Sequence, residues 1–89
     1  MMIKIDIERK AHFSRYVFGS AVYSDNPEDI DVAIIYDKQY VSIEEALAYR
    51  KEICIQLQKL HFMSIDSILL STQEEKEMSF LMNAKNYEF

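Results

Sequence analysis

The sequence has little of several residue types that mark particular protein classes. It contains one glycine, one proline, one cysteine and no tryptophan. So few glycines and prolines exclude collagen-like chains and Gly/Pro-rich disordered chains, and the lone Cys54 excludes an internal disulfide. No apolar run approaches the ~20 residues of a membrane-spanning helix, and residues 1–10 lack the apolar block of a signal peptide. We therefore expect a cytoplasmic protein with no membrane partner.

Positive charge is also scarce. Lys and Arg number 10 against 15 Asp and Glu, which gives a net charge of −5. Direct binding to nucleic acid is therefore not expected, because nonspecific contact with a phosphate backbone needs a basic surface. A bound nucleotide would need metal ions to supply much of the positive charge.

Apolar side chains, by contrast, are plentiful. The 89 residues are 49% hydrophobic, which is enough for the core of one domain, and we expect that domain to span residues 1–89. A domain of this size buries only about 60–65% of the surface of its unfolded chain. We therefore expect a partner or self-association to stabilise it, through an interface built partly on residues 78–82.

Short strands and helices are predicted to alternate along the chain. Apolar and β-branched runs favour strands, and apolar spacing of three and four favours helices. The resulting fold class is α+β, a small mixed sheet of about three strands with helices packed on it. The expected strands are residues 15–18, 29–36 and 63–70, the expected helices are residues 42–60 and 72–84, and a polar loop is expected at residues 24–28.

The first residues are ambiguous. Ile3, Ile5 and Ile7 alternate as in a strand, whereas Ile3, Ile7 and Ala11 follow helical spacing. We expect a short helix that continues to about Phe13, and we assign no element to residues 85–89.

Both longer helices begin with a capping-box pattern. Ser42 precedes Glu45, and Thr72 precedes Glu75, each at the spacing that lets the two residues cap a helix start. In the second helix, Met78, Leu81 and Met82 are expected to point inward. In the first, one apolar stripe is predicted to face the core: Ile43, Ala46, Leu47, Ile53, Cys54, Leu57 and Leu60.

Paired acids open the predicted strand at residues 29–36. Because alternate side chains of a strand share a face, Asp29 and Asp31 project together. Adjacent carboxylates repel each other, and a cation relieves that repulsion. Oxygen ligands at this spacing suit Mg²⁺, although the pair could also cap the strand or face solvent.

A third acid, Asp66, lies inside the predicted strand 63–70. An Asp within an apolar strand needs a partner, a metal ion or an exposed position on an edge strand. If the two strands are neighbours, the three acids converge, and three carboxylates can hold two metal ions about 3.5–4 Å apart. Gly19 and Ser20, at the end of the strand 15–18, could approach a phosphate group through their backbone and hydroxyl groups.

The histidines carry a weaker signal. His12 and His61 have no Cys or Asp at metal-ligand spacing, and we expect both to be partly exposed structural residues. Cys54 is expected to lie in the core rather than to act as a nucleophile.

The order Gly19-Ser20, a loop, Asp29-Ile30-Asp31 and a later strand Asp66 resembles the nucleotidyltransferase superfamily, which includes DNA polymerase beta. The short chain is most similar to the minimal nucleotidyltransferases, the type found as antitoxins beside helical HEPN proteins. The resemblance implies that Gly19 and Ser20 bind the nucleotide phosphates. It also implies that Asp29, Asp31 and Asp66 are the catalytic residues of a two-metal Mg²⁺ site.

The implied reaction is transfer of a nucleoside monophosphate, from ATP or another nucleoside triphosphate, to a protein acceptor. A HEPN-type protein is the implied partner, and a homo-oligomer is also expected. Two departures from the family pattern keep a second interpretation open: the loop between Ser20 and Asp29 holds only eight residues, and Ala21, Val22 and Tyr23 replace the usual Arg and Gly. Under that interpretation the protein is a degenerate member that serves only as a binding or assembly partner.

Overall fold

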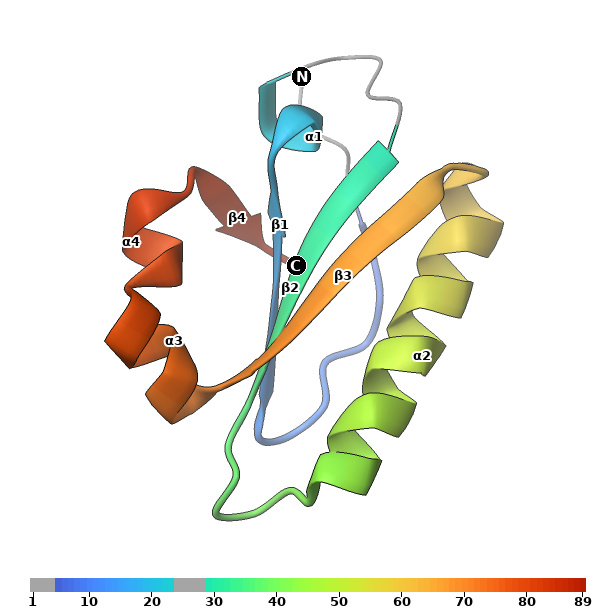
Figure 1. Ribbon diagram of the computed structural model, residues 1–89. Helices are drawn as coiled ribbons and strands as arrows, with labels where there is room; N and C mark the ends of the chain where they lie inside the picture. The colour runs from blue at the N-terminus through green and yellow to red at the C-terminus, as the bar shows by residue number, and fades with distance from the viewer. Residues whose placement is uncertain (1–4, 24–28) are drawn as a thin grey trace.

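The computed structural model describes residues 5–23 and 29–89 (Figure 1). The predicted loop at residues 24–28 and the first residues of the predicted N-terminal helix lie outside this part of the chain. The elements, in chain order, are β1 (Phe13–Phe18), α1 (Ser20–Tyr23), β2 (Asp29–Tyr36), α2 (Ile43–His61), β3 (Ser64–Ser71), α3 (Thr72–Met78), α4 (Phe80–Asn83) and β4 (Asn86–Glu88).

The strands form one mixed sheet in the order β3-β2-β1-β4. β1 pairs antiparallel with β2 and with β4, whereas β2 and β3 are parallel and are connected through α2. β2 is buried over most of its length and lies between two strands, as the apolar residues 32–36 predict. The α+β mixed sheet is thus confirmed. The fourth strand, β4, comes from the tail to which no element was assigned.

Helices lie on both faces of the sheet (Figure 1). On one face, Val32 and Ile34 of β2 pack in the main core with Ile53 and Leu57 of α2. The half-buried Ile5 and Ile7 complete this face. On the other face, the Phe18 ring of β1 meets the Phe80 ring of α4 edge-on, with centroids 5.0 Å apart.

The prediction of a helix at the N-terminus is wrong for residues 5–12, which form neither helix nor strand. A buried side chain explains the difference. Arg15 donates hydrogen bonds from Nη2 to the Ile7 carbonyl at 2.8 Å and from Nη1 to the Glu8 carbonyl at 3.1 Å. A helix would direct these carbonyls to amides four residues later, so the Arg15 contacts favour the irregular path.

α2 begins as predicted but buries a narrower stripe than expected. The Ser42 hydroxyl oxygen accepts a hydrogen bond from the Glu45 amide at 3.2 Å, which is the expected N-cap. The buried residues are Ala46, Tyr49, Ile53 and Leu57. Cys54 is half-buried, and Ile43, Leu47 and Leu60 of the predicted stripe are 49%, 43% and 57% exposed.

The predicted last helix is divided into α3 and α4 at Ser79, which has a left-handed φ of 50°. The capping box is formed by Ser71 and Glu74, one residue before the predicted pair, because the strand continues to Ser71. Met78 and Met82 do not point inward but are 57% and 86% exposed. An interface at residues 78–82 remains a prediction.

Among the helices of the described residues, none combines the length and the apolar character required to cross a membrane.

Candidate metal site

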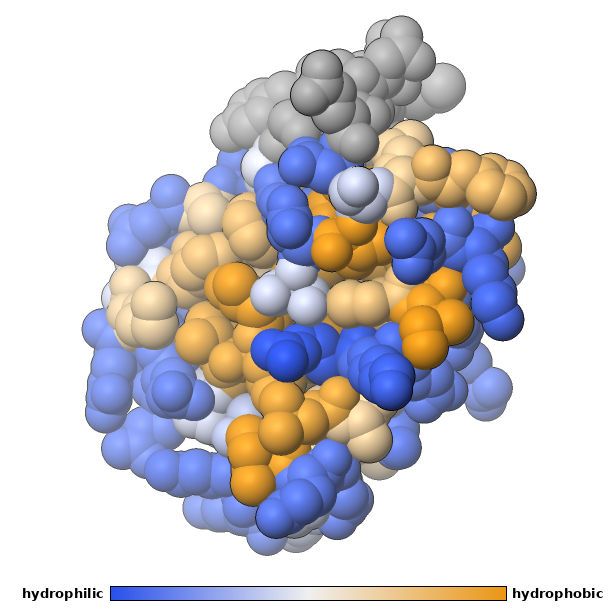
Figure 2. All heavy atoms as spheres, turned by 45° about the vertical axis from the view of Figure 1, so that its right-hand side comes forward, coloured by the Kyte–Doolittle hydropathy of each residue, from blue (hydrophilic) through white to orange (hydrophobic). Residues whose placement is uncertain are grey.

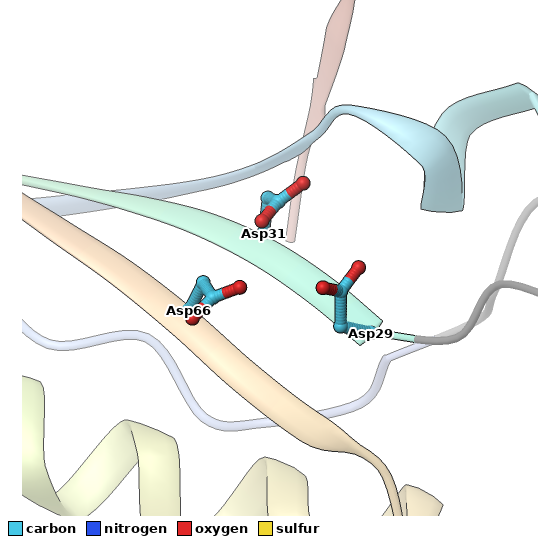
Figure 3. A group of neighbouring side chains, drawn as sticks. All are labelled: Asp29, Asp31 and Asp66. Atoms are coloured by element: carbon cyan, nitrogen blue, oxygen red, sulfur yellow. The ribbon is translucent and has the colours of Figure 1, made fainter.

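The three acids predicted to act together come from neighbouring strands at one end of the sheet. Asp29 and Asp31 occupy alternate positions at the start of β2 and share a face. The parallel register places Asp66 of β3 directly beside Asp31. Figure 3 shows the three carboxylates directed into one shared space on this face.

The carboxylates are close enough to share a cation. One oxygen from each of Asp29, Asp31 and Asp66 lies within 4.8 Å of the other two. Two ligands of the same Mg²⁺ lie at most about 4.2 Å apart, twice the metal–oxygen distance. Small side-chain rotations therefore suffice to bring all three onto one ion. Asp29 and Asp31 are half-buried and Asp66 is exposed, so a cation could enter from the Asp66 side.

Asp31 is the central member of the group, and its ionised form is disfavoured. Desolvation by burial, followed by the charges of Asp29 and Asp66, raises the pKa of the Asp31 carboxyl above its ordinary value of 3.8. A cation held by the three acids would offset both the desolvation and the repulsion.

This raised pKa predicts a pH dependence of stability. Because the Asp31 pKa is higher in the folded than in the unfolded state, its ionisation opposes folding above that pKa. Asp31→Asn should therefore be more stable than the wild type at neutral pH, and the difference should shrink as pH falls toward about 4. Urea unfolding of both metal-free proteins across this pH range measures the difference. A difference that grows toward acid pH would contradict the assignment.

Gly19 lies against the same carboxylate. It follows β1, whose last residue Phe18 pairs with Asp31, and it has a left-handed φ of 73°. A Cβ added at Gly19 would collide with Oδ2 of Asp31 and lie 3.2 Å from its Cγ. Glycine is thus favoured by the left-handed backbone conformation, and any larger residue here would displace the Asp31 carboxylate.

Gly19→Ala should destabilise the protein by about 2 kcal/mol, because alanine is strained at positive φ and its methyl group must displace Asp31. Asp31→Ala removes the obstacle but leaves the φ strain. The free energy of unfolding of the double variant should therefore fall by less than the sum of the changes in the two single variants. Denaturant unfolding of the four proteins measures this coupling, and strict additivity would show that Gly19 and Asp31 do not constrain each other.

Ser20, the other residue predicted to bind phosphate, begins the four-residue helix α1. Its side chain lies outside what the structure describes, so the predicted hydroxyl contact remains a prediction. The histidines are not part of the acidic group. His12 stacks on Tyr40 with ring centroids 4.3 Å apart, and His61 ends α2.

An all-carboxylate set of ligands favours hard divalent cations over zinc or copper. The group formed by Asp29, Asp31 and Asp66 could thus hold a metal ion. No protein-family model, no curated protein and no solved structure matches this chain.

Proposed function

We propose that the protein is a Mg²⁺-dependent nucleotidyltransferase that transfers a nucleoside monophosphate, AMP from ATP, to a protein acceptor. The observation that supports this proposal is the convergence of Asp29, Asp31 and Asp66 beside Gly19. The resemblance of the Gly-Ser and Asp-x-Asp segments to nucleotidyltransferases connects that geometry with a reaction.

In the proposed reaction each acid has its own role. Asp29 and Asp31 would hold both Mg²⁺ ions, and Asp66 would complete the ligands of the second ion. When bound, Mg²⁺ neutralises the phosphate charge that develops during the displacement. The acceptor oxygen bonds to the α-phosphorus, the bond from that phosphorus to the bridging oxygen breaks, and pyrophosphate leaves. Asp66, the exposed acid, accepts the proton of the attacking hydroxyl group.

Gly19 and Ser20 hold the departing phosphates in this proposal. Gly19 has no side chain between its backbone and the Asp31 carboxylate. The backbone that follows β1 therefore lies directly beside a carboxylate that would hold the metal ion of a metal-bound triphosphate.

The proposed acceptor is a protein, and a HEPN-type protein is the partner we consider first. The net charge of −5 disfavours a nucleic-acid acceptor. A small acidic domain suits association with a larger, more basic protein. As an antitoxin, the protein would neutralise such a partner by binding it or by attaching AMP to it.

Thermal unfolding with and without ligands tests the proposal. Mg²⁺ should raise the melting temperature, and Mg²⁺ with ATP should raise it further, because ligands that bind only the folded state stabilise it. At a ligand concentration of 100 Kd the gain is about 2.7 kcal/mol. K⁺ at the same ionic strength is the control for nonspecific screening. No shift with Mg²⁺ or Mg²⁺–ATP, with or without the partner, would refute the enzyme proposal.

The degenerate alternative has one structural observation in its favour. Ala21, which stands where minimal nucleotidyltransferases usually carry a basic residue, is fully buried in the core. A side chain that could bind the triphosphate is thus absent at that position. Binding of a partner by a protein that gains no stability from Mg²⁺–ATP would favour this alternative.

A further inference from the structure

The two edges of the sheet differ in how well they are protected. Edge strand β4 has three residues, and short edge strands rarely pair with other chains. Edge strand β3 has eight residues, SIDSILLS, and within residues 5–23 and 29–89 it pairs only with β2. Its register with β2 is continuous, so it contains no bulge, and its sequence has no Lys, Arg, Pro or Gly. Apart from the single charge of Asp66, the devices that usually protect an edge strand are therefore missing from β3.

The free edge of β3 continues into an apolar flank of α2. One flank of α2, with Tyr49, Glu52 and Gln56, lines a cavity that it shares with residues 7–10. By the helical period, Ile43 and Leu47 lie on the opposite flank, toward β3. They are 49% and 43% exposed. Figure 2, which brings the α2 side of Figure 1 forward, shows apolar patches on the surface in this view, separated by hydrophilic side chains.

We propose that this surface is a homodimer interface, in which the β3 strands of two copies pair antiparallel and join their sheets into one of eight strands. Unpaired backbone N–H and C=O groups along β3 are complementary to another extended strand. A two-fold axis perpendicular to the sheet keeps both α2 helices on the same face. The apolar flanks with Ile43 and Leu47 then lie on the same face of the joined sheet, beside the paired β3 strands.

The charges of β3 select the register and are compatible with self-pairing. Asp66 is the only charged residue in the strand. An axis at Asp66 would place two like charges opposite each other, which is unfavourable. An axis at Ile68 instead pairs Ile68 with its copy and places Asp66 opposite Leu70. The acids of each copy stay on one face of the joined sheet, where Leu70 of the other copy lies beside Asp66.

Sedimentation velocity over a range of concentrations tests the proposal. The wild type should dimerise, and added NaCl should strengthen dimerisation by screening the charge of −5 on each copy. Ser67→Lys, which places a charge in the middle of β3, should weaken dimerisation by about tenfold or more. Leu47→Lys on α2 should weaken it too, and this variant stays informative if Ser67→Lys does not fold. Met82→Lys, on the 86% exposed Met82 of α4, is the matched control and should dimerise as the wild type does.

Hydrogen exchange identifies the surface. The β3 amides that do not bond to β2 should gain protection as the protein concentration rises. A monomer at all concentrations, dimerisation of both Lys variants at wild-type affinity, or selective loss of the dimer in Met82→Lys would each overturn the proposal.

Discussion

Asp31→Asn should abolish the Mg²⁺–ATP increment in melting temperature and lower nucleotidyl transfer by about 100-fold or more, which corresponds to about 3 kcal/mol of transition-state stabilisation. Asp31 lies beside Asp66 and two residues from Asp29, so it belongs to two of the three pairs of acids that could share a cation. Asparagine keeps the shape of the side chain and removes its charge. The metal-free protein should remain folded, because the pKa of the Asp31 carboxyl is raised by its surroundings and its ionisation opposes folding.

The measurement combines thermal unfolding with detection of AMP attached to the acceptor by mass spectrometry. Asp6→Asn is the matched control, since it removes one acidic charge at an exposed position outside the site. This control should keep the wild-type response to Mg²⁺–ATP. If Asp31→Asn kept the full increment, Asp31 would not be a ligand. If both variants lost it, the effect would come from net charge alone.

Arg15→Met should lower the free energy of unfolding by about 3 kcal/mol or more, which is the cost of leaving one buried and two partly buried carbonyls without their charged donor. Arg15 is only 2% exposed. Its Nε and Nη2 donate to the Phe89 carbonyl at 3.1 and 2.9 Å, and Nη1 and Nη2 reach the carbonyls of Glu8 and Ile7. The guanidinium carbon also lies 4.7 Å from the centre of the Phe89 ring. Methionine fills similar space but donates no hydrogen bond.

For a domain of this size the expected loss lowers the melting temperature by about 12–24 °C. Arg9→Met is the control, because the Arg9–Glu88 ion pair is exposed and an exposed pair contributes about 0–1 kcal/mol. Arg15→Lys should lower the melting temperature by an intermediate amount, since one ammonium group cannot reach all three carbonyls. Equal melting temperatures for Arg15→Met and Arg9→Met would show that the hydrogen bonds of Arg15 contribute little to the stability of the fold.

The acidic group was predictable from the sequence because it follows from strand periodicity. Alternation places Asp29 and Asp31 on one face, and an Asp within the next apolar strand suggests a third member. The register that puts Asp66 beside Asp31, rather than two residues away, depends on how α2 returns the chain to the sheet. Sequence periodicity does not contain that information. The contact of Gly19 with Asp31 depends in the same way on the pairing of β1 with β2.

The errors at the N-terminus and in α2 each involve one side chain whose burial the sequence pattern left open. This side chain is Arg15 for the N-terminus and Tyr49 for α2. Arg15 alternates with Phe13 and Val17 and could have been placed inward on that basis, but Tyr16 and Phe18 made the opposite face equally apolar. Once Arg15 is buried, it takes the carbonyls that the expected helix needed. Tyr49, which was omitted from the predicted stripe of α2, is buried and packs against Phe13 with ring centroids 4.2 Å apart.

The partnership of Arg15 with Phe89 has a consequence for the order in which a nascent chain can fold. The two residues are separated by 74 positions, so at about 5–20 residues per second a ribosome takes roughly 4–15 s to supply the second after the first. During that interval β1 can pair with β2, but its other edge and the Arg15 guanidinium await β4. The pairing of β1 with β4 and the burial of Arg15 against Phe89 therefore cannot be completed before residues 86–89 have been synthesised.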